Sequence, residues 1–317
     1  MPKLVTIVGA TGNQGRAVIA ALSSDPNYTL RGLTRNVQSQ SAQELKSQGV
    51  EMVEATLDNL AALKAAFKGS YAVYGVTGIK ENLATKDLPT LEALEEEWGK
   101  NISQAAAETD GLEHFIWSTL PHALENSGGR FHLSNHIAKN KVDDYIRANA
   151  DLAAKTTFLI IAQYHSNYSI GPISIHPIPS ANAYVHFASH PPDTPISWIG
   201  DVKRNLAPFI KPILEQTAKT KGNVVFAEAE THTSEESLQI WAKAKGVRAF
   251  HVPISAELSH ALWGKYDDVL AGMWRYWGEF REKSWSTPGY TVITKDDLGV
   301  TGFTSLAETF KNYEFKK

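Results

Sequence analysis

The chain has 317 residues and 43% hydrophobic residues, enough for one large or two moderate domains with a substantial core. It contains no cysteine, which excludes disulfides and thiol catalysis, and its net charge of −3 disfavours direct nucleic-acid binding. Its apolar runs are far shorter than the ~20 residues of a membrane helix and no signal-peptide pattern follows Met1, so we expect a soluble, cytoplasmic protein, with the nucleus as a second compartment.

The first predicted elements are a strand, a tight turn and a helix. An apolar run over residues 3–8 ends in Gly9, Gly12 and Gly15, and apolar residues then recur at helical spacing to residue 22. Gly9 would allow the turn, Gly12 would let the backbone approach a pyrophosphate, and Gly15 would let the helix lie close to the sheet. The free N–H groups of a helix start attract phosphate. We therefore expect dinucleotide binding, with a bare packing turn as the alternative.

The next two strands end in residues suited to the adenosine half of a dinucleotide. Residues 28–34 form the second predicted strand, which ends at Arg35. An arginine there pairs with the 2′-phosphate of NADP, whereas NAD is read by a carboxylate. This favours NADP(H), with NAD(H) also accepted, and an exposed arginine is the alternative. Asp58 follows the third strand, over residues 50–55, and could either accept from the adenine amino group or cap the helix that starts near Asn59.

The βα alternation continues to residue 162. A fourth strand over residues 69–76 ends at Thr77, whose backbone would line the cofactor. The stretch 79–100 leads into a helix to about residue 108, and we interpret its glutamates as a solvated helix face; they are Glu92, Glu95, Glu96 and Glu97. A fifth strand (114–118), a loop (119–130) where a substrate cleft would open, a helix (131–148) and a sixth strand (156–162) follow. This order predicts an α/β fold with a doubly wound parallel sheet.

The pattern changes beyond residue 163. Six prolines fall between residues 164 and 195, and we then expect a helix over residues 198–214, a strand over 223–228, a helix over 234–245 and a short strand over 249–252. We predict a dinucleotide-binding domain at residues 1–163 and a smaller C-terminal substrate or partner domain at residues 164–317, with segment 198–228 packed back on the sheet. Aromatic residues between positions 258 and 281 favour core or dimer surface over a ligand site, and the oligomeric state stays open.

The candidate catalytic group lies on the helix over residues 131–148. Short-chain dehydrogenases use a tyrosine four residues before a lysine, but the residue four before Lys139 is Asn135, and an amide cannot release a proton near neutral pH. Tyr145 falls on a different helix face. Lys139, or His136 three residues before it, could act as donor. The alternative is that Lys139 only holds a ribose hydroxyl and His136 faces solvent.

With these motifs in place, the chain resembles the NmrA-like family, a branch of the atypical short-chain dehydrogenases. The matching stretches lie within the first 170 residues; they are residues 8–15, 33–36, 75–77, 139–147 and 163–167. The resemblance implies a Rossmann domain with a smaller C-terminal domain. It also implies NADP(H) binding along a set of residues that comprises Gly9, Thr11, Gly12, Asn13, Gln14, Gly15, Arg35, Asp58, Thr77, Lys139, Tyr164 and Asn167.

The resemblance leaves two functions open. Some family members sense the NADP/NADPH ratio and bind partner proteins, among them a fungal repressor acting on a GATA-type transcription factor; others resemble quinone or isoflavone-type reductases that use a lysine without the tyrosine. The missing tyrosine favours a redox-sensing regulator. The alternative is an NADPH-dependent reductase of a carbonyl, quinone or enone that uses Lys139 or His136. Two departures from the family pattern are the uncharged residues 37–39, where relatives that favour NADP often carry extra basic residues, and the histidine-bearing loop 121–134, which keeps a substrate site open.

Overall fold

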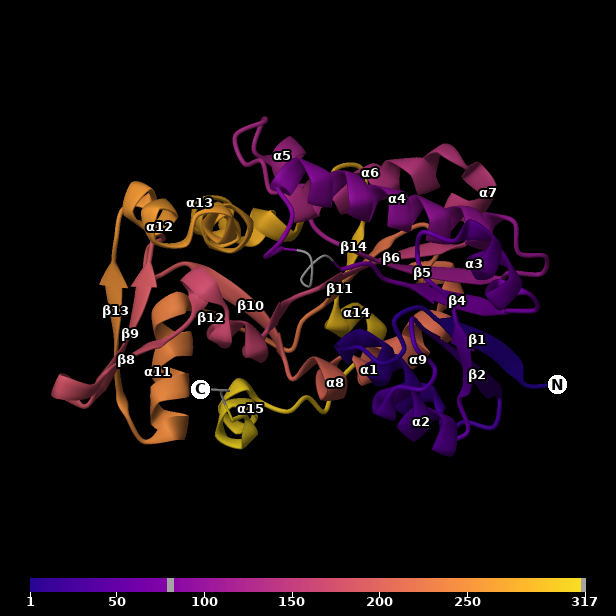
Figure 1. The fold of residues 1–317 in the computed structure, drawn as a ribbon, viewed down its shortest axis with the longest axis horizontal. Helices are drawn as coiled ribbons and strands as arrows, with labels where there is room; N and C mark the ends of the chain where they lie inside the picture. The colour runs from indigo at the N-terminus through magenta and orange to yellow at the C-terminus, as the bar shows by residue number, and fades with distance from the viewer. Residues whose placement is uncertain (79–82, 315–317) are drawn as a thin grey trace.

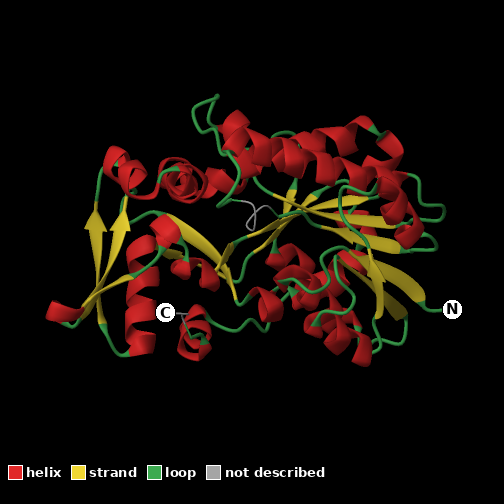
Figure 2. Ribbon diagram, viewed as in Figure 1, coloured by secondary structure: helices red, strands yellow, loops and turns green. Residues whose placement is uncertain are grey.

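The computed structural model describes residues 1–78 and 83–314. A large sheet with helices on both faces forms one side of the molecule, and two small sheets with their own helices form the other (Figures 1 and 2). The strands of the large sheet are β1 (Lys3–Ile7), β2 (Tyr28–Thr34), β3 (Glu51–Glu54), β4 (Ala72–Gly75), β5 (His114–Thr119), β6 (Thr156–Ile161), β11 (Val224–Ala227) and β14 (Val292–Ile293). The small sheets are formed by β7 (Gln163–Tyr164), β10 (Pro195–Gly200) and β12 (Glu230–Thr233), and by β8 (His176–Ile178), β9 (Ala183–Ala188) and β13 (Arg248–Pro253).

Helices connect most of these strands. The α-helices are α1 (Asn13–Leu22), α2 (Gln40–Ser47), α3 (Leu60–Phe67), α4 (Leu88–Ala107), α5 (Ala123–Asn126), α6 (Ser134–Ala148), α7 (Ala150–Ala153), α8 (Val202–Asn205), α9 (Ala207–Glu215), α10 (Thr217–Thr220), α11 (Ser234–Lys245), α12 (Ala256–Trp263), α13 (Gly272–Phe280), α14 (Lys295–Leu298) and α15 (Leu306–Asn312). Short 3₁₀ or π turns are η1 (His165–Ser169), η2 (Gly171–Ile173), η3 (Pro179–Ala181), η4 (Asp267–Ala271) and η5 (Arg281–Trp285). Within the described ranges, no helix is both long and apolar enough to cross a bilayer.

The large sheet confirms the predicted α/β class. Its strand order is β14-β11-β6-β5-β4-β1-β2-β3, and every pairing in it is parallel. Strands β5 and β6 are buried along their whole length, as expected for parallel strands covered by helices on both faces. The strand order reverses between β1 and β4, and ligands of doubly wound sheets bind in the crevice at that point.

The segment after the proline-rich stretch differs from the prediction of one helix over residues 198–214. Residues 195–200 form strand β10, and Gly200, at φ +65°, ends it. Asp201 then accepts from the Lys203 N–H at 3.1 Å and caps α8. Helices α8 and α9 pack on α1, and β11 pairs with β6. Strand β14 also joins the large sheet, which the sequence did not indicate. The division into domains at residue 163 stays a prediction.

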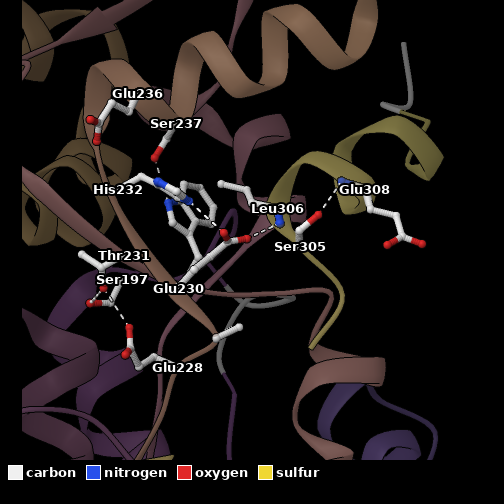
Figure 3. Close-up of polar contacts among 12 residues, drawn as sticks. Ser197, Glu228, Glu230, Thr231, His232, Glu236, Ser237, Ser305, Leu306 and Glu308 are labelled. Atoms are coloured by element: carbon white, nitrogen blue, oxygen red, sulfur yellow. Dashed lines mark hydrogen bonds and ion pairs between the residues drawn. The ribbon is translucent and has the colours of Figure 1, made fainter. Parts of the chain in front are cut away.

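Polar contacts attach the C-terminal helix α15 to strand β12 of a small sheet. The Glu230 carboxylate on β12 accepts hydrogen bonds from the Leu306 N–H and from His232 Nε2 (Figure 3). Thr233 and Glu236 form the predicted capping box of α11. Helix α15 also packs directly against α11.

The aromatic residues near the C-terminus belong mainly to the core. Trp274 and Tyr276 are fully buried on α13, as the prediction of core over ligand site requires. Trp277 is also buried but lines a cavity beside the large sheet. One of these aromatic residues therefore contributes to a candidate site.

Candidate functional site

The turn between β1 and α1 has the geometry of an anion-binding helix start. Gly9 has a φ of +65°, which favours glycine. A Cβ on Gly15 would lie 2.4 Å from the Gly9 carbonyl oxygen, so only glycine lets α1 approach the strand so closely. Gly12 is the N-cap, and no side chain among the described residues caps the helix. The first N–H groups of α1 are therefore free to bind a phosphate.

A groove of about 850 Å³ extends from this helix start along the carboxyl ends of β1, β2, β3 and β4. Most of the predicted cofactor residues line it; they are Gly9, Thr11, Gly12, Asn13, Gln14, Gly15, Arg35, Asp58, Thr77 and Tyr164. Lys139 and Asn167 line an adjoining pocket instead. The groove has the position and the residue types that could hold a dinucleotide.

Arg35 and Asp58 lie at the end of the groove that would take the adenosine. Both are exposed, Arg35 directly after β2 and Asp58 before α3. The N-cap of α3 is Asn59, whose side chain accepts from the Ala62 N–H at 3.0 Å. The interpretation of Asp58 as the helix cap is therefore wrong, which leaves its carboxylate available to a ligand in the groove.

The second pocket, of about 210 Å³, shares Gln14, Thr77 and Tyr164 with the groove. Tyr74 donates to Gln14 Oε1 at 2.7 Å, and Gln14 Nε2 donates to the Tyr164 hydroxyl oxygen at 2.8 Å. Burial raises the pKa of Tyr164 to about 12, so the phenol stays protonated near neutral pH. These two hydrogen bonds set the orientation of the Gln14 amide where groove and pocket meet.

Lys139 projects from α6 to the ends of β4 and β5. Its Nζ donates to Thr77 Oγ1 at 2.9 Å and to the Ser118 carbonyl at 3.1 Å, and it lies 3.5 Å from Glu95 Oε1. The residue is only 8% exposed. The ammonium group is therefore held in one place at the floor of the pocket.

Glu95 is the residue that the sequence interpretation missed. The prediction of a solvated face is wrong for it, because Glu95 is 2% exposed and accepts from Thr77 Oγ1 at 2.8 Å. It supplies the negative charge beside Lys139. Its spacing is the signal that could have found it, because the buried residues Leu91 and Gly99 stand four positions before and after it on α4. The predicted stretch 79–100 began with residues 79–82, which lie outside the described residues.

His136 is buried, so the alternative that it faces solvent is wrong. Its Nδ1 lies 2.9 Å from the Pro121 carbonyl oxygen. Burial lowers the pKa of His136 to about 4, because the charged ring would lose its hydration. Near neutral pH the ring is therefore uncharged, and it is better suited to accept a hydrogen bond than to give up a proton.

A buried carboxylate joins α6 to the end of β5. Asp143 accepts from Trp117 Nε1 and from Thr119 Oγ1, each at 2.8 Å, and its Oδ2 lies 3.2 Å from His122 Nε2. These contacts fasten α6, which carries His136 and Lys139, to the strand end and the loop that follow Trp117. They give Asp143 a positioning role that the sequence did not reveal.

Comparison with known proteins identifies relatives along most of the chain. The model of the NmrA-like family matches residues 1–295. An NmrA-like family domain-containing oxidoreductase of Aspergillus hancockii, hkm9, is 33% identical over 54% of this chain and 50% of the relative, so the match spans about half of that protein. A second such oxidoreductase, FrzB of Cladobotryum sp., is 26% identical over 80% of this chain and 77% of its own length.

Solved structures share the fold at low identity. NmrA, a negative transcriptional regulator in complex with NADP, matches with a TM-score of 0.73 and 18% identity over 98% of this chain and 95% of that one. The triphenylmethane reductase of Citrobacter sp., complexed with NADP(H), matches with a TM-score of 0.67 and 19% identity over 97% and 98% of the two chains. Because the family model covers all but the last 22 of the 317 residues, the chain belongs to the NmrA-like family.

Proposed function

We propose that the chain is an NADP(H)-dependent oxidoreductase that acts on a small molecule in the 210 Å³ pocket. The observation that carries this proposal is the junction of groove and pocket at Gln14, Thr77 and Tyr164, with Lys139 beside it. A molecule bound in this pocket would lie next to the end of the groove that we propose for the dinucleotide. The names of the two fungal relatives, both oxidoreductases, point in the same direction.

The residues of the groove fit a nicotinamide dinucleotide. The uncapped start of α1 suits the pyrophosphate, and Arg35 suits a 2′-phosphate at the adenosine end. We therefore propose NADP(H) as the cofactor, with NAD(H) also accepted. When bound, the nicotinamide would supply or accept a hydride.

Lys139 is the charged donor of the pocket. Thr77, Ser118 and Glu95 fix its ammonium group, which would hold the ribose hydroxyl or stabilise negative charge on a substrate oxygen at the pocket floor. The Glu95 carboxylate offsets the cost of keeping this cation out of water. His136, being uncharged, would position the substrate and would not protonate it.

Turnover measurements test the proposal. NADPH oxidation is followed with a panel of carbonyl, quinone and enone substrates for the wild type, Lys139→Ala and the matched control Lys141→Ala, whose half-exposed side chain lies on the same helix. We expect kcat/KM to fall about 100-fold or more in Lys139→Ala, as for loss of one oriented donor, and to stay within about twofold in the control. Unchanged turnover in Lys139→Ala would show that the assigned role is wrong.

A redox-sensing regulator is the second candidate. It is favoured by Asn135, which lines the pocket where short-chain dehydrogenases carry the catalytic tyrosine, and by the contacts that already occupy Lys139. Its partner would be a protein such as a transcription factor. Binding of such partners is compared in the presence of NADP⁺ and of NADPH, and identical binding in both would argue against this function.

A further inference from the structure

Some residues that line the small pocket carry a buried polar atom that has no partner among the described residues. Three of its lining residues have a buried side-chain atom without a hydrogen-bond partner among residues 1–78 and 83–314; these atoms are Asn135 Oδ1, His136 Nε2 and Gln163 Nε2. Buried polar groups in native proteins are almost always paired. Three unpaired atoms around one cavity therefore indicate a ligand with complementary donors and acceptors.

The neighbours of His136 determine what its free nitrogen can do. The Pro121 carbonyl oxygen can only accept, so Nδ1, 2.9 Å away, must carry the ring proton. Burial keeps the ring uncharged near neutral pH, since it lowers the pKa to about 4. Nε2 therefore presents a lone pair, and the ligand group that meets it must be an O–H or N–H donor.

Gln163 has the opposite preference. Its Oε1 already accepts from Asn167 Nδ2 at 3.1 Å, so the free atom Nε2 is a donor. The ligand thus needs a hydrogen-bond donor toward α6 and an acceptor toward β7.

The apolar residues that line the pocket favour a ligand with a flat ring. The rings of Trp277 and Trp285 have centroids 5.0 Å apart, and Met273 and Leu270 complete an apolar surface. Flat aromatic rings pack well against such walls. An apolar cavity of about 150 Å³ holds one benzene ring, so a pocket of about 210 Å³ has room for a single ring with small substituents.

We infer that the pocket binds a small hydroxylated aromatic carbonyl compound, whose hydroxyl donates to His136 Nε2 and whose carbonyl oxygen accepts from Gln163 Nε2. This inference rests on the proposed function, because it treats the same pocket as the substrate site. It makes His136 the residue that selects hydroxylated rings.

Calorimetric titration of the full chain with 4-hydroxybenzaldehyde and with 4-methoxybenzaldehyde tests the inference. The methoxy probe lacks the hydroxyl donor and adds one methyl group, so variants of His136 are needed to separate a lost hydrogen bond from added size. Two variants separate the nitrogens of His136. His136→Asn supplies an amide N–H in place of the Nδ1 donor to Pro121 and removes the acceptor at the Nε2 position. His136→Gln keeps an acceptor at the Nε2 position. NADP⁺ and NADPH are titrated separately into each protein.

We expect the wild type to bind the hydroxy compound at least about tenfold more tightly than the methoxy compound, because only the hydroxyl pairs the buried Nε2. The preference should fall to about twofold or less in His136→Asn and survive in His136→Gln. Equal affinity of the wild type for both probes, no binding of either, or a preference that persists in His136→Asn would overturn the inference. A protein that prefers the hydroxy compound but has no affinity for NADP(H) would overturn the proposed function and leave this inference standing.

Discussion

Replacing Glu95 by glutamine tests whether a buried ion pair holds the floor of the pocket. The substitution keeps the shape of the side chain and an oxygen that can accept from Thr77, but it removes the charge that lies 3.5 Å from Lys139 Nζ. The ammonium group then stays buried without a counter-charge, since Lys139 is 8% exposed. The variant should therefore be destabilised.

The expected loss follows from the burial of both partners. Removing one partner of a buried pair costs about 3–5 kcal/mol, and the retained hydrogen bond to Thr77 places Glu95→Gln near the lower end, at about 3 kcal/mol. Replacing both partners, in Glu95→Gln/Lys139→Met, removes the unpaired charge and should restore most of this loss. Glu97→Gln is the matched control, because Glu97 is exposed on the same helix, and it should change the free energy of unfolding by less than about 0.5 kcal/mol.

Urea unfolding followed by tryptophan fluorescence measures the four proteins. A stabilising ion pair between Glu95 and Lys139 is excluded if Glu95→Gln loses no more stability than Glu97→Gln, or if the double variant is less stable than Glu95→Gln.

Three further predictions concern the groove and the buried histidines. In Gly15→Ala the new Cβ would lie 2.4 Å from the Gly9 carbonyl oxygen and 2.6 Å from Ala10 Cα, so α1 must move. We expect the free energy of unfolding to fall by about 1–3 kcal/mol and the dinucleotide affinity to fall at least about tenfold; an unchanged affinity by calorimetry would contradict the close packing of α1. In Arg35→Ala the NADP(H) affinity should fall by about 2 kcal/mol, roughly thirtyfold, while NAD(H) affinity is unchanged; parallel losses for both cofactors would refute recognition of the 2′-phosphate. Burial lowers the pKa of His114 and His186 to about 3 and that of His136 to about 4, from 6.5. These rings stay neutral in the folded state, whereas the same histidines take up protons in the unfolded chain. The contribution to the free energy of unfolding is therefore full above pH 6.5 and falls as the pH drops toward 3, by about 2 kcal/mol per histidine between pH 7 and pH 5. Unfolding curves that coincide at these two pH values would exclude this effect.

The structure bears out those predictions that depended on local pattern. The glycines at positions 9, 12 and 15 lie at a strand-turn-helix junction, as their spacing indicated. The alternation of apolar strands with helices predicted the parallel sheet, because each parallel strand needs a covered crossover. Residues 198–200 were predicted as helix but form a strand, because their short apolar pattern fits both elements and β10 pairs with β12 and β7.

The sequence by itself determined the fold class, the glycine-rich turn at the start of α1 and the helix that carries Lys139, because these follow from residues close together along the chain. Only the tertiary structure decided that Glu95, 44 positions before Lys139, is its buried counter-ion. It also decided that His136 is buried, with Nδ1 beside the Pro121 carbonyl oxygen, and that Trp277 lines the same pocket. A charge or an aromatic ring on a helix looks the same in sequence whether it faces water or a cavity, and its environment exists only once distant elements have packed together.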